Sequence, residues 1–285
     1  MLRVGVIGPW RTDLARRHTV VEPVPDPLAG VAAYDQLLVT FDDAVPPVWA
    51  DLLARGIIAQ KSVRYIDEYL EAEHGRVVAA HFAPEMALGR RREGYRRRKL
   101  FLDRALIVLT LPLTLLIAAI VSLAIGLTMG SPVLFVETRL GRGGREFPMW
   151  KFRTMRPNRP GALVTTPDDA RVTRLGRVLR RCRIDELPQL RNVWRGDMSL
   201  VGPRPEQPAL AAEYARAEPA FAHRLLVLPG ITGLAQVTSG YAGDLAESRI
   251  KLGADLYYIK YGSHALDAQI LMRTIWTVFR GLGAR

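Results

Sequence analysis

Residues Ala105–Leu127 read ALIVLTLPLTLLIAAIVSLAIGL, a run of 23 residues without a charged side chain. A helix of about 20 such residues crosses the hydrocarbon core of a bilayer, and few helices of soluble proteins are apolar on every face. The run therefore predicts a helix that enters a membrane. Pro112 lies inside it and should kink or break the helix, because proline removes a backbone hydrogen bond.

Both flanks of this run are basic. Arg90–Arg92 and Arg96–Lys99 precede it, and the cations that follow are Arg139, Arg142, Arg145, Lys151 and Arg153. Lysine and arginine beside membrane helices favour the cytoplasmic side, so both ends belong on one side of the membrane. A helix–break–helix that enters and leaves one leaflet satisfies this, and we favour it over a single span. Thr110 and Thr114 stand close enough to bond the backbone groups that the break would free.

A second stretch, Arg180–Pro205, reads RRCRIDELPQLRNVWRGDMSLVGPRP. Its adjacent carboxylates, Asp185 and Glu186, lie among six arginines: Arg180, Arg181, Arg183, Arg191, Arg195 and Arg204. Guanidinium groups hold phosphate oxygens bidentately, and carboxylates can bind Mg2+ or attack phosphorus. The spacing alone fits equally well a helix capped by Asp185, with Pro188 in its first turn. The preceding membrane segment favours a phosphate-handling site at a membrane surface.

Residues 1–88 alternate between strand and helix patterns, which predicts a parallel sheet. The expected strands are Arg3–Ile7, Thr19–Glu22, Gln36–Phe41 and Gly56–Ala59, and the expected helices are Val48–Arg55 and Tyr65–Glu73. The first strand ends in Gly5-Val-Ile-Gly8-Pro9, which is not GxGxxG, and Pro9 lacks the amide that would bind phosphate. We favour a degenerate, structural or regulatory Rossmann-like module over a working nucleotide site.

Beyond residue 131 the patterns are mixed. We expect strands at Val133–Val136, Phe147–Arg153 and Ala235–Thr238, and helices within Ala170–Arg181, Glu206–Ala217, Pro219–Leu226, Leu245–Tyr261 and His264–Leu282. Some of these helices are amphipathic, which suits the membrane interface or, equally, a soluble core. The predicted organisation is an N-terminal module (1–88), a basic linker and membrane-entry segment (89–104), a re-entrant helix (105–130) and a catalytic domain (131–285).

The composition limits the partners. A net charge of +12 and a pI of about 10.3 indicate an anionic partner: nucleic acid, lipid head groups or a phosphorylated substrate. The arginines cluster around the membrane flanks and the carboxylates rather than on an aromatic platform, which argues against nucleic acid. The single cysteine, Cys182, excludes an intramolecular disulfide and is expected to be a small filler residue. The five histidines have no ligand spacing, so no zinc site is predicted, and MLRVGVIG is not a signal peptide.

From Lys99 to about Leu282 the chain resembles the bacterial sugar transferases, which are monotopic polyprenyl-phosphate phosphoglycosyl transferases. The resemblance rests on ordered motifs: KLFLDRALIV, GSPVLF, KFRTM, RVTRLGRVLRR, DELPQLRNVWRGDMSLVGPRP, PGITGLAQV and DLYYIKY. Residues 1–88 resemble a shortened form of the Rossmann-like domain of larger members. The implied α/β fold is a small Rossmann-like module followed by a monotopic α+β catalytic domain, with a re-entrant membrane helix and interfacial amphipathic helices.

The resemblance also implies a reaction at the cytoplasmic face of the bacterial inner membrane. A sugar 1-phosphate moves from a UDP-sugar to undecaprenyl or another polyprenyl phosphate, giving UMP and a polyprenyl diphosphosugar for surface glycan assembly. Asp185 would be the nucleophile that forms an aspartyl phosphosugar, and Asp185 and Glu186 would hold Mg2+. The residues expected to bind phosphate are Lys151, Arg153, Arg180 and Arg204.

Some residues depart from the pattern of that family. Glu137 replaces a glutamine, Arg183 a serine, and Leu228 an arginine whose phosphate contact could be lost; Arg183 could compensate for that charge. A non-catalytic scaffold or regulator that keeps the fold is therefore the alternative. The sugar is not identified; selectivity is expected in Pro157–Asp169 and Ser239–Glu247. Dimerisation through the N-terminal module or the C-terminal helix is left open.

Overall fold

The computed structural model contains two compact units, Met1–Val78 and Ala79–Arg285. The structure describes residues 2–9, 19–28, 30–41, 45–66, 68, 71, 75–77, 79, 82, 84–87, 90–156, 169, 171–238 and 245–279.

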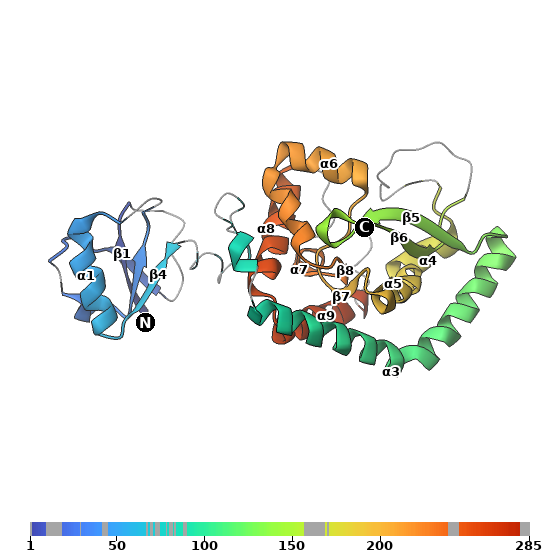
Figure 1. Ribbon diagram of the computed structural model, residues 1–285, viewed down its shortest axis with the longest axis horizontal. Coiled ribbons are helices and arrows are strands. Elements are labelled where there is room, and N and C mark those ends of the chain that lie inside the picture. The colour runs from blue at the N-terminus through green and yellow to red at the C-terminus, as the bar shows by residue number, and fades with distance from the viewer. Residues whose placement is uncertain are drawn as a thin grey trace. The chain divides into compact units, whose positions relative to one another are not determined.

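The first unit contains a four-stranded sheet in the order β2-β1-β3-β4, and every neighbouring pair is parallel, as predicted (Figure 1). The strands are β1 (Leu2–Ile7), β2 (Thr19–Pro23), β3 (Gln36–Val39) and β4 (Ser62–Tyr65); η2 (Val31–Ala33) precedes β3. The predicted strand Gly56–Ala59 is wrong, because helix α1 (Pro47–Ile58) continues through it. Gly56 lets α1 approach β3: a Cβ there would lie 2.5 Å from Leu37 Cδ1.

The second unit begins with a long helix. Helix α3 (Arg90–Met129) is 40 residues long, so the predicted basic linker and the apolar segment form one element. Glu93 pairs with Arg96 at 2.9 Å and with Arg97 at 3.5 Å, and pairs at these spacings stabilise a helix. The linker is therefore helical rather than an irregular connection.

The predicted break at Pro112 is a bend instead. The helix continues through Pro112, and it changes direction about midway along its length (Figure 1). Thr110 Oγ1 donates to the Leu106 carbonyl at 2.9 Å, and Thr114 Oγ1 donates to the Leu111 carbonyl at 3.0 Å. Hydrogen bonds from threonine side chains to carbonyls of the same helix often accompany a bend.

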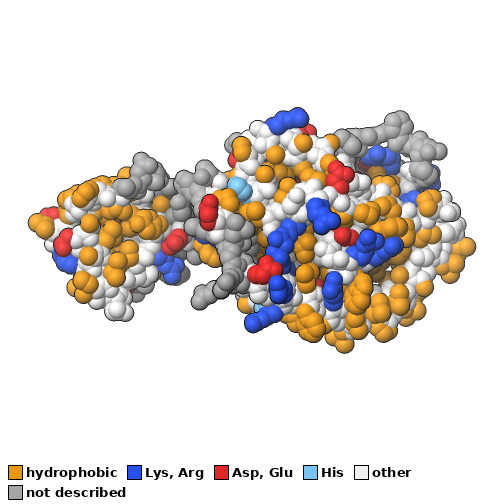
Figure 2. Space-filling model, in the orientation of Figure 1, with side chains coloured by type: hydrophobic (Ala, Val, Ile, Leu, Met, Phe, Trp, Pro, Cys, Tyr) orange, Lys and Arg blue, Asp and Glu red, His pale blue; other side chains and the backbone are white. Residues whose placement is uncertain are grey.

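Helix α3 is buried only along a narrow stripe. Ile107 packs with Phe147, Met149, Val193 and Met198 in one cluster, and Val121 and Ile125 pack with Phe152 and Leu179 in another. The most apolar 18-residue stretch of α3 has a mean hydropathy of 2.7, and only 11% of it is buried. Within the described part of the chain, α3 is the one helix that is long and apolar enough to cross a membrane. Figure 2 shows hydrophobic side chains along the edge that α3 forms. This surface suits lipid.

A buried polar group fixes the start of α3. Lys99 Nζ lies 2.9 Å from Asp267 Oδ2, and Tyr95 Oη donates to the same carboxylate at 2.7 Å. Ser199 Oγ donates to Asp103 Oδ2 at 2.6 Å. Tyr95, Lys99 and Asp103 are spaced four residues apart and so lie on one face of α3. The first two attach this face to the helix that carries Asp267, and Asp103 attaches it to the strand that begins at Ser199.

The remaining elements surround two small sheets. Strands β5 (Leu134–Leu140) and β6 (Glu146–Phe152) overlap the predicted strands Val133–Val136 and Phe147–Arg153, and they pair as an antiparallel hairpin. Strand β7 (Ser199–Val201) pairs in parallel with β8 (Gly230–Thr232). The helices are α4 (Arg174–Arg181), α5 (Leu190–Arg195), α6 (Pro208–Ala217), α7 (Leu234–Thr238), α8 (Leu245–Tyr261) and α9 (His264–Phe279), with 3-10 helices η4 (Pro84–Ala87), η5 (Arg142–Gly144), η6 (Ile184–Gln189) and η7 (Pro219–Leu226).

The predicted strand near β8 is wrong. Ala235–Thr238 was predicted as a strand and is helix α7, whereas the strand falls on Gly230–Thr232. A Cβ on Gly230 would lie 2.1 Å from Gly202 N, so only glycine allows the two backbones to come this close. The loop that follows β7 at Gly202 therefore lies directly against strand β8.

Candidate active site

The two carboxylates predicted as catalytic lie on η6. Its Ile184 and Leu187 pack in the cluster that contains Val121 of α3, so η6 rests on the second half of the membrane helix. The residue before η6, Arg183, has left-handed backbone angles (φ 54°, ψ 22°), and no side chain caps the helix. The alternative in which Asp185 caps a helix is therefore wrong, and the pair lies beside α3.

Glu186 is buried against arginines. Arg204 Nη1 donates to Glu186 Oε1 at 3.1 Å, and Arg183 Nη1 lies 3.5 Å from Oε2. Burial alone raises the pKa of Glu186, but Arg204, Arg183 and Lys151 outweigh it and hold the pKa below its usual value. Oε2 is buried and has no hydrogen bond within the described residues. Glu186 is thus an ionised carboxylate with one oxygen available to a ligand.

Asp185 is also buried, with 9% of its surface exposed, and the described residues give it no hydrogen bond or ion pair. Burial raises its pKa to about 6, and Glu186 adds to this, whereas Lys151, Arg180 and Arg204 oppose it. The arginines that neighbour Asp185 in the sequence do not decide its ionisation. Burial is the larger effect, and the carboxylate is ionised only above a pH of about 6.

Lys151 and Arg180 approach the pair from two other elements. Burial, followed by repulsion from Arg204, lowers the pKa of Lys151 on β6 to about 8. Arg180 Nε donates to Thr154 Oγ1 at 2.9 Å. Gly176 permits this approach of α4, because a Cβ there would lie 2.1 Å from the Thr154 carbonyl. The structure therefore brings Lys151, Arg180 and Arg204 together around the carboxylates.

Arg153, the fourth predicted phosphate ligand, lies elsewhere. It is buried at the end of α3, where its Nη2 donates to the carbonyl of Met129 at 2.6 Å and to that of Gly130. Lysine or arginine at a helix C-terminus stabilises the free carbonyls there. The structure gives Arg153 this supporting contact and does not bring it into the group around Asp185.

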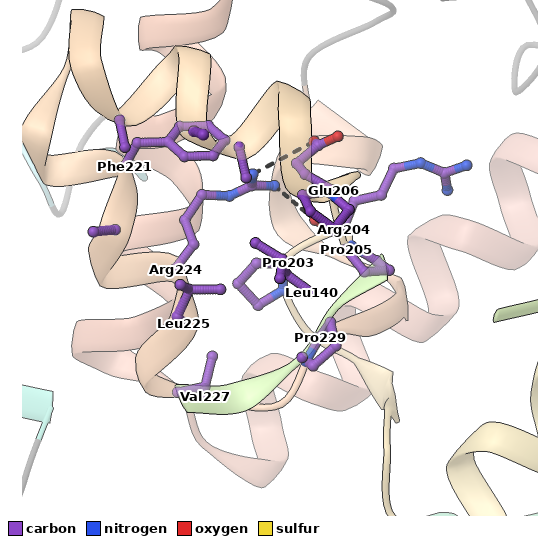
Figure 3. A pocket seen from close by; sticks show the side chains of 16 residues that line it. Leu140, Pro203, Arg204, Pro205, Glu206, Phe221, Arg224, Leu225, Val227 and Pro229 are labelled. Atoms are coloured by element: carbon purple, nitrogen blue, oxygen red, sulfur yellow. Dashed lines mark hydrogen bonds and ion pairs between the residues drawn. The ribbon is translucent and has the colours of Figure 1, made fainter. Parts of the chain in front are cut away.

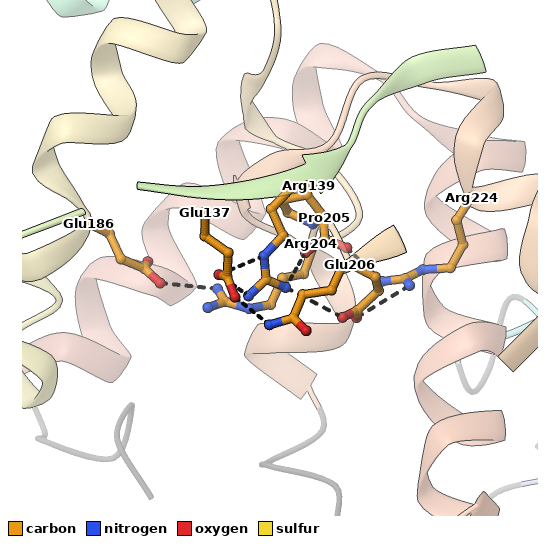
Figure 4. Close-up of polar contacts among 8 residues, drawn as sticks. Glu137, Arg139, Glu186, Arg204, Pro205, Glu206 and Arg224 are labelled. Atoms are coloured by element: carbon orange, nitrogen blue, oxygen red, sulfur yellow. Dashed lines mark hydrogen bonds and ion pairs between the residues drawn. The ribbon is translucent and has the colours of Figure 1, made fainter. Parts of the chain in front are cut away.

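Glu137 supports the loop that carries Arg204. It accepts hydrogen bonds from Arg139 Nε at 2.9 Å and from Gln207, and Arg139 Nη1 donates to the Pro205 carbonyl at 3.1 Å (Figure 4). A carboxylate in place of the glutamine of the family therefore has cationic and amide partners. The charge at Glu137 is accommodated.

Arg183 and Leu228 occupy different places. Arg183 faces Glu186, whereas Leu228 lines a small cavity with Tyr95, Arg96 and Lys99 near the start of α3. The positive charge of Arg183 therefore does not stand where an arginine at 228 would be. Cys182 is exposed rather than the small filler residue expected.

Sequence reasoning missed an ion-pair network behind the site. Arg224 Nε donates to Asp255 Oδ2 at 2.8 Å, its Nη1 donates to Glu206 Oε1 at 3.4 Å, and its Nη2 donates to the Arg204 carbonyl at 2.9 Å. These partners are 18 to 31 residues from Arg224 in sequence, so no local spacing reveals them. The one available signal was Asp255, which opens the DLYYIKY motif.

Comparison with known proteins identifies the family. The family model described as "Bacterial sugar transferase" matches residues 94–281, well over half of the chain. The chain belongs to the bacterial sugar transferase family. The predicted resemblance is confirmed.

Curated relatives of this sugar transferase carry related names. The UDP-N-acetylgalactosamine-undecaprenyl-phosphate N-acetylgalactosaminephosphotransferase of Aeromonas hydrophila is 40% identical over 275 residues, 94% of this chain and 65% of that protein. The UDP-glucose:undecaprenyl-phosphate glucose-1-phosphate transferase of Caulobacter vibrioides is 43% identical over 62% of this chain and 68% of its own length. The exopolysaccharide production protein PSS of Rhizobium leguminosarum bv. phaseoli is 39% identical over 54% of this chain and 82% of its own length. The chain thus spans about two thirds of the first two relatives.

The site of this sugar transferase has the composition that Mg2+ requires. Mg2+ in phosphate-handling sites keeps several waters and takes one or two carboxylates plus substrate phosphates. Asp185 and Glu186 supply the carboxylates, and Glu186 Oε2 is a buried oxygen without a hydrogen bond in the described structure. The described residues hold no group of three or more His, Cys, Asp or Glu, so phosphates and water would complete the ligand set. The segments predicted to select the sugar, Pro157–Asp169 and Ser239–Glu247, lie mostly outside the described residues.

Proposed function

We propose that this chain transfers a sugar 1-phosphate from a UDP-sugar to a polyprenyl phosphate such as undecaprenyl phosphate. The products are UMP and a polyprenyl diphosphosugar. One observation carries the proposal: Asp185 is a buried carboxylate without a hydrogen bond in the described structure, it faces three cations, and it lies beside the membrane helix. The names of the relatives support the same reaction.

The reaction proceeds in two displacements at one phosphorus atom. An Asp185 carboxylate oxygen attacks the β-phosphorus of the UDP-sugar, and the bond to the bridging oxygen breaks, so that UMP leaves with the electron pair. The product is a phosphosugar ester of Asp185. An oxygen of the polyprenyl phosphate then attacks the same phosphorus and releases the Asp185 carboxylate. Lys151, Arg180 and Arg204 bind the phosphoryl oxygens in both steps.

Asp185 and Glu186 would hold Mg2+, which when bound neutralises charge on the diphosphate. Arg204 has a second role in this site, because its hydrogen bond to Glu186 fixes the direction of that carboxylate. Only 9% of Asp185 is exposed, which limits the access of water and so slows hydrolysis of the aspartyl ester before the lipid phosphate arrives.

The proposed location is the cytoplasmic face of the bacterial inner membrane. The exposed apolar surface of α3 contacts lipid, and the basic flanks of the apolar segment keep both its ends on one side. η6 packs on this helix, so the carboxylates stand where a soluble nucleotide and a membrane-bound phosphate can both arrive.

A panel of UDP-sugars tests the proposal. The purified chain in lipid nanodiscs is mixed with undecaprenyl phosphate and Mg2+, and release of UMP is measured. We expect release with at least one UDP-sugar and none with Asp185→Asn. Asp197→Asn, which alters a carboxylate of the same segment that pairs with the exposed Arg195, is the matched control and should retain activity. Lipid binding without UMP release from any sugar would instead favour a scaffold.

A further inference from the structure

A cavity of about 220 Å³ lies behind the Arg204 loop, between α6 and η7 (Figure 3). Most of its wall is apolar, and side chains that form it include Leu140, Ala211, Ala215, Phe221, Leu225 and Val227. Arg204, Glu206 and Arg224 supply the charged part of the wall, and Glu206 accepts a hydrogen bond from Arg224. The mechanism above assigns no role to this space.

The cavity is joined to the site but lies away from the membrane helix. Arg204 lines the cavity, and its Nη1 lies 3.1 Å from Glu186 Oε1, so one arginine side chain spans the interval between cavity and carboxylates. Figure 1 shows α6 on the opposite side of this unit from α3. An occupant therefore arrives from the aqueous side and can reach the carboxylates with its other end.

We propose that this cavity binds the uracil base of the nucleotide substrate, an inference that rests on the proposed function. The size fits, because an apolar cavity of about 150 Å³ is enough to hold benzene, another six-membered planar ring. A hexose fits poorly, since an apolar wall would leave several hydroxyl groups without hydrogen bonds. A polyprenyl chain stays in the lipid beside α3, across the unit from the cavity.

Arg224 is the polar group that can recognise the base. Its three hydrogen bonds, to Asp255, Glu206 and the Arg204 carbonyl, use fewer N–H groups than a guanidinium carries. The remaining donors suit the carbonyl oxygens of uracil. Asp255 and Glu206 balance the charge of Arg224, and Phe221 packs on it with its ring centre 4.5 Å from the guanidinium carbon. The donor group is therefore held rigidly before a ligand binds.

Alanines keep the cavity open. Helix α6 presents Ala211, Ala212 and Ala215 to it, on one face of the helix, whereas Ala209 is exposed and does not line it. A leucine at position 215 would occupy space that the base requires. A leucine at Ala209 would extend into solvent and makes a matched control on the same helix.

The test compares two ligands that differ in the base. Binding of UMP and of ribose 5-phosphate is measured by calorimetry on the full chain in nanodiscs, together with the KM for the UDP-sugar and for polyprenyl phosphate. The wild type should prefer UMP by about tenfold or more, in line with the contribution of a stacked base. Ala215→Leu should remove most of this preference and raise the KM for the UDP-sugar. Ala209→Leu should keep both values.

Several outcomes overturn the inference. A folded Ala215→Leu protein that keeps the UMP preference contradicts it, and so does a variant that changes only the KM for polyprenyl phosphate, which would assign the cavity to the lipid. If Ala215→Leu does not fold, Ala212→Val takes its place under the same criteria. The proposed function fails separately: UMP would then bind with the base preference, while no UDP-sugar would yield UMP in the wild type.

Discussion

Two buried charged groups in the catalytic unit differ in how well their charges are satisfied. In the Arg224 cluster (Arg224, Glu206 and Asp255), Arg224 donates hydrogen bonds to both carboxylates. In the carboxylate site (Asp185, Glu186 and Lys151), Asp185 and Lys151 have no hydrogen bond within the described residues, and Glu186 keeps one oxygen without one. In the first group the charges are paired with one another through hydrogen bonds, and in the second Asp185 and Lys151 are not.

The electrostatics separate individual residues rather than the two groups. Burial disfavours the charge on Arg224, yet Asp255 and Glu206 outweigh it and raise its pKa, and cations likewise hold the pKa of Glu186 below its usual value. Burial is the larger effect at Asp255, whose pKa it raises, and at Asp185 and Lys151, where it raises the first pKa to about 6 and lowers the second to about 8. A buried charge without a close partner costs stability and is a feature of functional sites. The Arg224 cluster therefore supports the fold, and the carboxylate site carries the chemistry.

Asp185→Asn should separate the two roles most strongly. Without the nucleophile, UMP release should fall by roughly a thousandfold or more, as it does when a covalent nucleophile is removed elsewhere. Stability should rise, not fall. The folded pKa of about 6 lies above the usual value of 3.8, so stability is lost as pH rises from about 3.8 to about 6, and the full cost is present above about pH 6. Removing it should raise the free energy of unfolding by about 3 kcal/mol near neutral pH, measured by thermal unfolding.

Asp255→Asn should show the opposite pattern. It leaves Arg224 buried with one carboxylate partner fewer, and removing one member of a buried pair costs about 3–5 kcal/mol. Burial raises the pKa of Asp255 as it does that of Asp185, but Asp255, unlike Asp185, accepts a hydrogen bond of 2.8 Å from a buried arginine, so we expect a clear fall in the unfolding temperature. Asp197→Asn is the control, because its partner Arg195 is more than half exposed and such pairs contribute about 0–1 kcal/mol. Equal stability of the two variants would contradict the structural role of Arg224.

The pH dependence of kcat/KM should reflect the carboxylate site alone. Asp185 must be ionised to attack, so activity should rise as pH increases through about 6. Lys151 must be protonated to bind phosphate oxygens, so activity should decline as pH increases through about 8. The measurement is UMP release across this range at low UDP-sugar concentration. A flat profile from pH 5 to 9 would count against both assignments.

Lys151→Met should alter that profile in a defined way. Lys151 is the first of the cations that lower the pKa of Asp185, so its loss should move the acid limb to higher pH. The alkaline limb should disappear, because the group that titrates there is gone. Arg145→Met, at an exposed position, should leave both limbs unchanged. An unmoved acid limb in Lys151→Met would show that the lysine does not act on Asp185.

The sequence predicted the parts of the molecule that depend on local patterns. Local sequence patterns predicted the apolar helix and the parallel sheet. They also predicted that the carboxylate pair lies beside the apolar helix. The bend at Pro112 was predicted as a break, because the sequence alone does not show whether a helix continues through a proline. Strand β8 was missed, because it depends on the close contact between Gly202 and Gly230.

The division between structural and chemical charges could not be predicted at all. Arg153 and Arg204 look alike in sequence, and only the fold directs Arg153 to the end of α3 and Arg204 to Glu186. The pKa of Asp185 depends in the same way on burial by distant residues, which the adjacent arginines conceal. Long-range packing decides which charges are satisfied.

The most direct test of the central claim is the intact mass of the protein after incubation with a UDP-sugar in the absence of polyprenyl phosphate. The account predicts a mass increase of one sugar phosphate on Asp185, with release of one UMP per active site and loss of the adduct when polyprenyl phosphate is added. Asp185→Asn should show neither the adduct nor the UMP. Full turnover by the wild type without any adduct at Asp185, or an adduct that persists in Asp185→Asn, would contradict the account.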